Sequence, residues 1–480
     1  MWNSGRGYTP AVALPSLVQG RFTSANSRAA TSNPVTIGLP NNTLTGNCLI
    51  VVVTSDTTVT SASVNDNLSS GIWGAAAVSS VGSTRRIDVF VGLNCPAGIN
   101  TILVTHTAGT PTNTHYAVYE FYNIAQASAL DGTSHNDSAT APNLTAGSIT
   151  TTQDGDLIFC YGAQMSGAGT ITHWNPGTAI PFGLLNAANL NSTVDVAPCT
   201  QFGIQSTHGA VNPDMSCTGG SGASQMVAIA LKAANAGTAP AAGIRVVTVQ
   251  GYNIYGATEA TGPWAMQFPT RGNLVHLSWE VLPADQSNPA NWVGLSGMSD
   301  TAGNSYGTNS APVFTALDVS AGFCQQACAQ NATPSLSNIV TANSDVVSSS
   351  SVSHFELYDV TGASSFDQVT TNSGKQTTAS TTLPTTSTTP SSTARQLHIS
   401  TCGIDAHTLS GASGPTGVLS DIAVCAAWDG GGTGLESDDG FAHAYTTSTS
   451  TIQFTYTVQN DAGGGINGVQ GWTGSTSSYK

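Results

Sequence analysis

Clusters of carboxylates in predicted turns are the first candidates for chemistry in this sequence. The clusters are Asn65-Asp66-Asn67, Asp154-Gly155-Asp156, Asp300 with Asn304, and Glu436-Ser437-Asp438-Asp439-Gly440. Carboxylate and carbonyl oxygens gathered on one turn are the ligands that Ca²⁺ prefers. Aspartate, asparagine and glycine are also the commonest turn-forming residues, so a plain turn is the simpler explanation of each cluster. We select Glu436, Asp438 and Asp439 as the predicted calcium ligands, and we expect no other cofactor.

Three tryptophans lie in turn-like contexts and are candidate ligand-binding residues. They are Trp174 in THWNPG, Trp264 in TGPWAM and Trp428 in AWDGGG. An indole ring combines a large apolar face with one polar N–H group, which suits it to stacking on a sugar. The same ring, turned inwards, caps a hydrophobic core. The sequence favours core capping and leaves sugar binding as the alternative.

The nine cysteines leave at least one thiol unpaired. Four of them are candidate disulfide partners because they lie close together in sequence: Cys199 with Cys217, and Cys402 with Cys425. Pairing cannot be deduced from spacing alone. Cys48 and Cys160 lie inside apolar runs, where a free cysteine behaves as a small hydrophobic side chain.

No catalytic signature is present. Glu120 and Glu356 lie in apolar segments, where a carboxylate is either an acid with a raised pKa or a group satisfied by its neighbours. Their recurrence in both halves favours the structural role. The sequence has no nucleophile elbow, no zinc-protease motif and no phosphate-binding loop. We therefore assign no catalytic residue and predict that the protein is not an enzyme.

Composition excludes two classes of partner. Charged residues make up only 8% of the 480 residues, and the net charge is −15. Such a chain offers no basic face to a nucleic-acid backbone. No run reaches the roughly 18 apolar residues of a membrane-spanning helix, so membrane insertion is not expected. The first residues lack the basic and apolar segments of a secretory signal.

Short runs of valine, isoleucine, threonine and aromatic residues recur between clusters of turn formers. They cover residues 48–54, 86–92, 100–106, 116–124, 155–162 and 225–233. Runs of this length and composition are typical of strands, and no stretch sustains a helical period. We predict an all-β fold of the sandwich class, either jelly-roll or immunoglobulin-like. The Ser/Thr-rich tract 377–393 is predicted to be a long loop or an edge strand.

An internal repeat relates the two halves of the chain. Residues 117–131 align without gaps to 353–367, which matches Glu120 to Glu356. We infer two β-sandwich domains that arose by duplication. The predicted organisation is an N-terminal arm (1–19), domain 1 (20–233), a linker (234–244) and domain 2 (245–480).

The repeated pattern of apolar strand, Asp/Asn turn and YEFYNI or FELYDV segment resembles the Ser/Thr/Gly-rich β-sandwich modules of phage virion proteins and bacterial surface proteins. This resemblance implies a non-enzymatic structural protein at the virion surface, either a capsid decoration or cement protein or a tail-associated fibre component. Its expected partners are other virion proteins and copies of itself, joined by packing and arm exchange. The alternative is a carbohydrate-binding adhesin that works extracellularly or on a bacterial surface and binds host-surface glycans. A third possibility is a polysaccharide-degrading enzyme.

Overall fold

A computed structural model gives the arrangement of most of the chain. The residues that it describes are 13–24, 33–107, 114–164, 171–187, 197–220, 222–254, 263–282, 295–308, 323–344, 352–376, 382–389, 391, 394–405, 408–413, 421–428, 437–447, 449–459 and 470–480.

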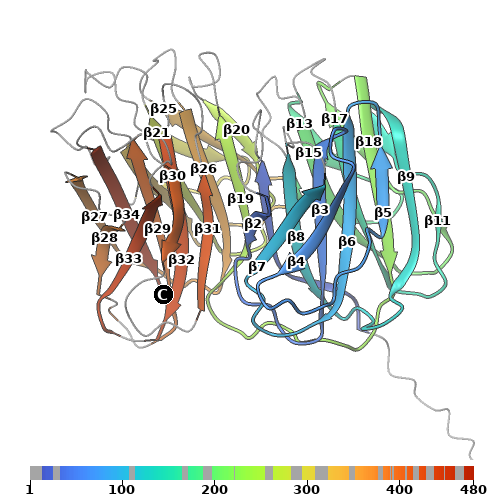
Figure 1. Cartoon of the computed structure of the whole chain (residues 1–480), viewed down its shortest axis with the longest axis horizontal. Coiled ribbons are helices and arrows are strands. Elements are labelled where there is room, and N and C mark those ends of the chain that lie inside the picture. The colour runs from blue at the N-terminus through green and yellow to red at the C-terminus, as the bar shows by residue number, and fades with distance from the viewer. Residues whose placement is uncertain are drawn as a thin grey trace, which may run out of the picture.

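The described residues form strands joined by turns and irregular segments, and no α-helix occurs among them (Figure 1). The predicted all-β fold class is therefore confirmed, and each of the six predicted strand segments overlaps a strand. Residues 47–56 are buried along their whole length because both faces of their sheet are covered, which explains an unbroken apolar run in place of alternation. Among the described residues no helix has the length and apolar character needed to cross a membrane.

Jelly roll 1 comprises residues 16–122. Its strands are β1 (Ser16–Ser24), β2 (Val35–Gly38), β3 (Asn47–Asp56), β4 (Ser61–Asp66), β5 (Val78–Val81), β6 (Arg85–Cys95), β7 (Thr101–Thr107) and β8 (His115–Tyr122). One sheet has the order β1-β8-β3-β6-β5 and the facing sheet has the order β2-β7-β4. This is the jelly-roll order, with the fifth strand joined to the sixth.

Jelly roll 2 comprises residues 130–231. Its strands are β9 (Leu130–Ala141), β10 (Asn143–Thr145), β11 (Ile149–Thr150), β12 (Asp156–Gln164), β13 (His173–Pro176), β14 (Phe182–Ala187), β15 (Ala197–Gln205), β16 (Ala210–Val211), β17 (Asp214–Thr218) and β18 (Gly222–Leu231). The order β13-β17-β10-β9-β18-β12-β15-β14 repeats the jelly-roll pattern within one folded-over sheet, and β11 pairs with β16 beside it.

Jelly roll 3 comprises residues 245–361. Its strands are β19 (Arg245–Ile254), β20 (Trp264–Gln267), β21 (Leu274–Leu282), β22 (Leu295–Asp300), β23 (Gly307–Thr308), β24 (Phe323–Gln330), β25 (Ile339–Ser344) and β26 (Val352–Thr361). Its sheet orders, β19-β26-β21-β24-β23 and β20-β25-β22, reproduce those of jelly roll 1 strand for strand.

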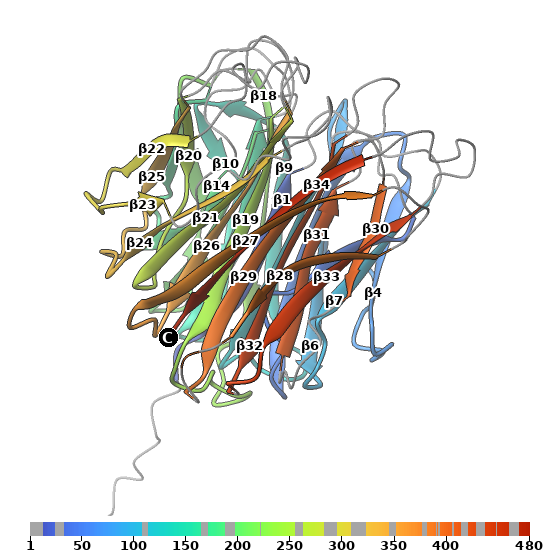
Figure 2. The same cartoon turned by 90° about the vertical axis from the view of Figure 1, so that its left-hand side faces the viewer.

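Jelly roll 4 comprises residues 366–479. Its strands are β27 (Phe366–Gln376), β28 (Thr382–Thr388), β29 (Gln396–Asp405), β30 (Thr408–Ser413), β31 (Asp421–Trp428), β32 (Ser437–Thr446), β33 (Ile452–Gln459) and β34 (Gln470–Tyr479). The orders β27-β34-β29-β32-β31 and β28-β33-β30 match those of jelly roll 2 (Figure 2). Strand β28 lies at a sheet edge, as predicted for the Ser/Thr-rich tract.

One sheet joins the two halves of the chain. β1 pairs in parallel with β19, with Gly20 opposite Thr248, so the larger sheets of jelly rolls 1 and 3 form a single sheet of ten strands. Parallel pairing of corresponding strands relates the halves by an approximate twofold axis along the strands, and this rotation exchanges the two faces of the sheet. Jelly roll 2 consequently lies beside β20 and jelly roll 4 beside β2.

The strands refine the predicted domain organisation in two respects: the number of jelly rolls in each predicted domain, and the residue at which the first strand begins. Each predicted domain holds two jelly rolls, because the sequence repeat has the length of half the chain. The central strand β1 begins at Ser16, inside the predicted arm of residues 1–19; of this arm, residues 1–12 lie outside the described residues. The matching strand orders agree with a duplication, whose ancestry stays a prediction.

Hydrophobic clusters fill the jelly rolls and the spaces between them. We call the cluster between jelly rolls 1 and 2 the first interlayer, and its members include Ile50, Val52, Val89, Tyr119, Phe159 and Ile229. We call the cluster between jelly rolls 3 and 4 the second interlayer, and its members include Leu274, Tyr358, Leu397, Ile399, Tyr445 and Tyr479.

Candidate functional site

A set of buried and half-buried polar groups lies where the two halves meet. We call this set the polar junction, and its members are Gln19, Arg21, Asn41, Glu120, Arg245, Glu356, Tyr358, His443 and Tyr445. The strands β1, β8, β19, β26 and β32, together with the segment after β2, supply these side chains. Strand pairing between β1 and β19 brings the two halves close enough for the contacts.

Glu120 is fully buried, and three donors satisfy its carboxylate. Gln19 Nε2 and Asn47 Nδ2 each donate to it at 2.6 Å, and the Leu44 backbone N–H donates at 2.9 Å. Burial raises the pKa of Glu120, and these hydrogen bonds act in the opposite direction. The favoured structural role for this residue agrees with its contacts.

Glu356 forms a buried ion pair with Arg21 of β1. The Tyr358 hydroxyl donates to its second oxygen at 2.7 Å. Both charged side chains are at most 1% exposed. A buried pair of this kind contributes little net stability, but loss of one partner leaves an uncompensated charge. The ion pair therefore fixes the first half against the second.

Further hydrogen bonds join jelly roll 1 to jelly rolls 3 and 4. Asn41 Nδ2 donates to the Val246 carbonyl at 2.8 Å, and the Tyr445 hydroxyl donates to Asn41 Oδ1 at 2.7 Å. His443 Nε2 lies 2.5 Å from the Pro40 carbonyl oxygen. Arg245 donates to the Val18 carbonyl at 2.5 Å. The junction is thus a filled, hydrogen-bonded interface, suited to holding domains together.

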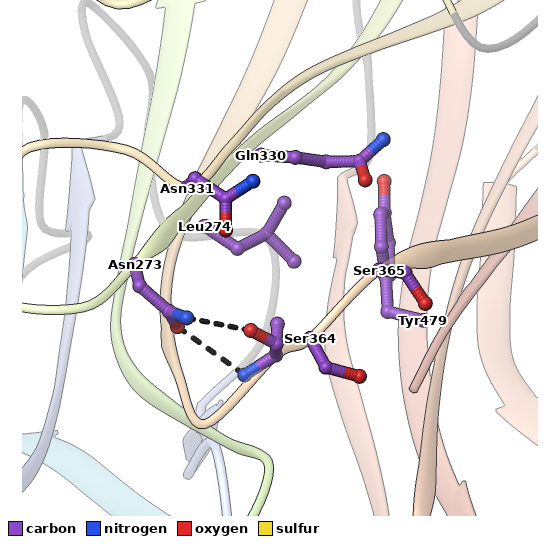
Figure 3. A pocket seen from close by; sticks show the side chains of 8 residues that line it. Asn273, Leu274, Gln330, Asn331, Ser364, Ser365 and Tyr479 are labelled. Atoms are coloured by element: carbon purple, nitrogen blue, oxygen red, sulfur yellow. Dashed lines mark hydrogen bonds between the residues drawn. The ribbon is translucent and has the colours of Figure 1, made fainter.

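A hollow beside the end of β34 is lined mainly by polar side chains (Figure 3). Its Asn273 side chain is occupied, because it donates to the Ala363 carbonyl at 2.5 Å and accepts from the Ala363 N–H at 3.2 Å. Tyr479 is the only titratable group among its lining residues. This hollow offers no pair of groups for acid–base chemistry.

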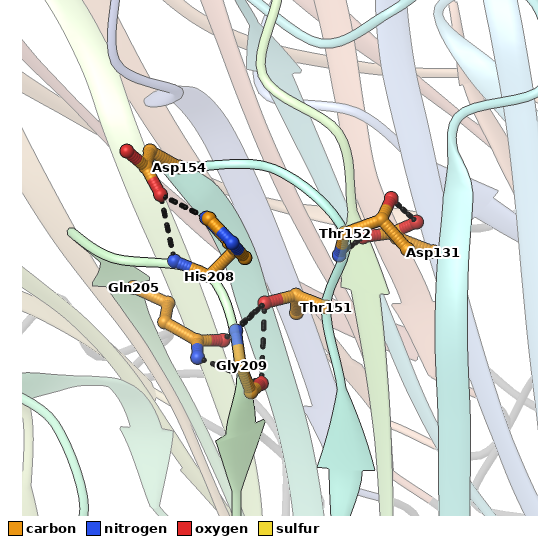
Figure 4. A network of polar contacts seen from close by, with 7 residues as sticks. All are labelled: Asp131, Thr151, Thr152, Asp154, Gln205, His208 and Gly209. Carbon is orange, nitrogen blue, oxygen red and sulfur yellow. Dashed lines mark hydrogen bonds and ion pairs between the residues drawn. The ribbon is translucent and has the colours of Figure 1, made fainter.

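The acidic cluster at Asp154 and Asp156 fastens loops at one end of jelly roll 2. Asp154 accepts from the His208 N–H at 2.8 Å and contacts its ring nitrogen at 2.7 Å (Figure 4). These bonds lower the pKa of Asp154. Asp131 accepts from the Thr152 hydroxyl at 2.6 Å. Burial, and then the neighbouring Asp131, raise the pKa of Asp156 to about 7.

The other described acidic turns are also closed by their own chain. Asp66 accepts from the Leu68 N–H at 2.9 Å and from the Trp73 indole at 2.8 Å. Asp300 accepts from the Asn304 amide group and from the Tyr306 hydroxyl, at 2.7 and 2.8 Å. Hydrogen bonds to the charged form lower the pKa of both aspartates against the effect of burial. Turn formation accounts for both clusters.

The predicted calcium ligands fall largely outside the described residues. Glu436 lies outside them, and the backbones of Asp438 and Asp439 lie in β32 rather than in a loop. Their side chains are not described. No group of three potential metal ligands occurs in the parts of the chain that the structure describes. The calcium site stays a prediction.

The position of Trp174 agrees with the favoured core-capping interpretation and not with the sugar-binding alternative. Its side chain is 0% exposed and belongs to the core of jelly roll 2. β13 pairs with β17 in the same sheet, with Trp174 opposite Cys217, and both side chains pack in this core. Gln267 holds the Trp174 backbone through hydrogen bonds of 2.7 and 2.8 Å. The backbone of Trp264 lies in β20 and that of Trp428 in β31, and both of their side chains lie outside the described residues.

The predicted disulfide between Cys199 and Cys217 is not formed in the structure, where both residues are free and buried. Cys402 is buried, and the side chain of Cys425 lies outside the described residues, so the second pairing stays a prediction. Cys199 of β15 and Cys217 of β17 both pack in the core of jelly roll 2 as small apolar groups. Burial raises the pKa of both thiols. Cys48 and Cys160 are also free and buried, as predicted.

Comparisons with known proteins add little. No protein-family model matches the chain, and no curated protein matches it. It is similar to a chain from "The Triple Jelly Roll Fold and Turret Assembly in an Archaeal Virus", with a TM-score of 0.16 and 10% identity over 73% of this chain and 91% of that one. It is also similar to a chain of infectious bursal disease virus, Gx strain, with a TM-score of 0.09 and 8% identity over 95% and 82%. Similarities this low carry no argument, so the fold rests on the strand orders.

Sequence reasoning missed most of the polar junction. It singled out Glu120 and Glu356 but none of their partners. Gln19 and Arg21 lie in a segment that was assigned in part to an arm, and Asn41 lies in a short turn. A charged residue inside a strand, such as Arg21 next to Phe22, is the one local signal that could have indicated a buried pair.

Proposed function

We propose that the protein is a non-enzymatic structural component of a phage virion, either a capsid decoration or cement protein or a tail-associated fibre component. Four jelly rolls joined by one ten-stranded sheet are the observation that carries this proposal. Such a chain presents a large, closed β surface, with its interior strands covered and its halves held together by the polar junction. Jelly rolls are common building units of virus particles and lectins.

The described interior supports a building role over catalysis. The buried carboxylates Glu120, Glu356 and Asp359 all have hydrogen-bond donors. None of them lines the hollow at β34. An active site would instead hold titratable groups convergently at a cleft. Because Trp174 is buried, it is not available to stack on a sugar, and this removes one of the three tryptophans on which the adhesin alternative depends.

Attachment to neighbours would use the segment that precedes β1. The Ala13 N–H donates to Asn235 Oδ1 at 2.6 Å, and Asn123 Nδ2 donates to the Leu14 carbonyl at 3.0 Å. These bonds fix the chain at Ala13 and Leu14, shortly before β1 begins. An extended segment at such a point can add a strand to the sheet of another copy.

The test is incorporation into particles. A chain lacking residues 2–12 keeps β1 intact and is expected to fold, as checked by circular dichroism, but to be lost from particles purified on a density gradient. A control chain that carries a scrambled sequence at residues 2–12 tests whether composition alone suffices. Full incorporation of the truncated chain would refute arm exchange. Absence of the intact chain from particles, or release of sugar from host polysaccharide, would refute the structural role.

A further inference from the structure

The two interlayers can be compared position by position through their strand registers. β3 and β21 occupy the same place in their sheets, and both begin at a Gly-Asn pair. On this basis Ile50 corresponds to His276. The neighbouring strands agree, because Ile50 pairs with Tyr119 and His276 pairs with Tyr358.

The first interlayer is apolar at positions where the second is polar. Its residues at these positions are Ile50, Val52, Val89, Phe202 and Ile229. The residues of the second half at the corresponding positions are His276, Ser278, Gln326, His443 and Ser477. Burial of apolar area is the main favourable term in packing one sheet on another. The second interlayer therefore depends far more on hydrogen bonds than the first.

Gln326 illustrates this dependence. Its side chain lies fully buried on β24, donates to Thr401 Oγ1 of β29 at 3.0 Å, and accepts from Ser477 Oγ of β34 at 2.5 Å. Hydrogen bonds between sheets hold only while the sheets keep their spacing. Separation of the layers would hydrate these groups at little cost, whereas it would expose bare apolar area in the first interlayer.

Two histidines lie within this polar layer. His276 is 0% exposed; its Nδ1 lies 2.5 Å from the Tyr479 hydroxyl and its Nε2 lies 2.9 Å from Ser278 Oγ. His443 is also 0% exposed. The edge of Tyr358 separates them, with ring centroids 5.6 Å from His276 and 5.8 Å from His443. The hydrogen bonds described for the two imidazoles join His276 to the Tyr479 and Ser278 hydroxyls and His443 to the Pro40 carbonyl.

The charges on the surrounding strands do not favour a proton here. The titratable and charged groups on the elements packed around the two imidazoles include Arg21 on β1, Arg245 on β19, Cys328 on β24, Glu356, Tyr358 and Asp359 on β26, Arg395 before β29, His398 and Cys402 on β29, Tyr445 on β32 and Tyr479 on β34. His398 is a further buried histidine, and burial lowers its pKa to about 4. Arg21 is paired with Glu356, and Arg395 lies 4.2 Å from the centre of the Tyr445 ring.

Burial lowers the pKa of His276 from 6.5 to about 3. Burial also lowers the pKa of His443 to about 4; the Arg21 charge acts in the same direction, and the bond to the Pro40 carbonyl opposes it. Imidazoles that reach water bind protons near pH 6.5. The packed state therefore keeps its full stability above pH 6.5 and loses it progressively as the pH falls towards 4.

We propose that the contact between jelly rolls 3 and 4 is an acid-operated joint, which opens when His276 and His443 take up protons while jelly rolls 1 and 2 stay packed. The first half has a buried histidine of its own on this face, His115, which stacks on Phe22 at the beginning of β8. His115 lies at the end of the apolar first interlayer. Opening that interlayer to protonate His115 would expose its apolar side chains to water, which opposes the opening. The joint is a property of the fold and does not depend on the virion role.

Hydrogen exchange followed by mass spectrometry compares the two interlayers within one molecule. Peptides from β26, β32 and β34 are compared with peptides from β8, β15 and β18 at pH 7.5 and at pH 5, after correction for intrinsic exchange. We expect protection of the first set to fall about tenfold or more relative to the second set. Equal loss in both sets, or loss in neither, would overturn the proposal without any variant.

A variant then tests the two imidazoles directly. His276→Ile with His443→Phe introduces the residues that the first half carries at these positions, and we expect it to keep protection at pH 5. His135→Gln, at a histidine that is 47% exposed, serves as the control and should open like the wild type. Opening of the double variant at the wild-type pH would also overturn the proposal.

Discussion

The ion pair between Arg21 and Glu356 gives the sharpest test of how the two halves are held together. Both side chains are at most 1% exposed, so neither charge can be hydrated when its partner is removed. Arg21→Met leaves the Glu356 carboxylate with the Tyr358 hydroxyl as its described donor. Breaking a buried pair in this way costs about 3–5 kcal/mol. We expect Glu356→Gln to be destabilising by a smaller amount, because the amide keeps the shape of the side chain.

The double variant Arg21→Met with Glu356→Gln separates the interaction energy of the two side chains from the effect that each substitution has by itself. Replacing both members of a buried pair by neutral groups is often close to neutral. We therefore expect Arg21→Met with Glu356→Gln to be more stable than Arg21→Met alone, by about 2 kcal/mol or more. The assay is urea unfolding, combined with hydrogen exchange of peptides from β1 and β26, because a chain of four jelly rolls need not unfold in one step.

The control is an ion pair at the surface. His208 and Asp154 are 59% and 63% exposed, and His208→Gln should change stability by no more than about 1 kcal/mol. If Arg21→Met costs no more than this control, the buried pair does not hold the halves together. Strict additivity of the two single changes would lead to the same conclusion.

Two further predictions follow from buried groups. Asp156→Asn, which introduces a neutral amide like that of Gln396 at the corresponding position of β29, should stabilise the protein by about 1–2 kcal/mol at pH 8 and not at pH 4. The folded-state pKa of Asp156 is raised from 3.8 to about 7. The contribution of Asp156 to the stability of the folded state is therefore complete below pH 4 and is lost as the pH rises through 7. Equal urea midpoints for the wild type and Asp156→Asn at pH 8 would contradict this prediction. Trp174→Ala should lower the free energy of unfolding by about 3–5 kcal/mol in the absence of any sugar, because the ring is 0% exposed. An unchanged unfolding midpoint would show that the ring is not packed in the core.

The fold class could be predicted from sequence because the relevant signals are local. Apolar runs such as 48–54 and 155–162 are strands in the structure, and the edge position of Thr382–Thr388 agrees with its Ser/Thr content. The four-fold division could not be predicted. Jelly rolls 1 and 2 share a strand order, but strand order is a property of pairing between distant segments, which composition does not encode.

The polar junction was beyond prediction for a related reason. Its hydrogen bonds join residues far apart in sequence, such as Asn41 with Tyr445 and Arg21 with Glu356. They exist because β1 pairs with β19 in parallel, which brings the second half beside the first. Nothing in the local sequence of β1 specifies β19 as its partner, because the pairing joins segments that are far apart in the chain. The polar junction is thus a consequence of the parallel pairing of β1 with β19, and this pairing is seen only in the structure.

The strand registers also show that the sequence repeat is displaced in β8 and β26. Leu49 pairs with Glu120, whereas Val275, at the position of Leu49, pairs with Asp359. The counterpart of Glu120 is therefore Asp359, three residues beyond Glu356. The gapless alignment matched Glu120 to Glu356 because it scores identical residues. It does not consider which face of the sheet each residue occupies, and that face is known only from the strand pairing.

Chemistry supports this correction independently of register. Glu120 accepts from the Leu44 N–H and from the Asn47 side chain, in the turn before β3. Asp359 accepts from the Gly272 N–H at 2.7 Å, in the turn before β21. Each carboxylate closes the same turn from the same end of the neighbouring strand, while Glu356 lies on the opposite face and pairs with Arg21. What the halves share is thus a carboxylate that satisfies turn donors, and the ion pair between Arg21 of the first half and Glu356 of the second is separate from this shared feature.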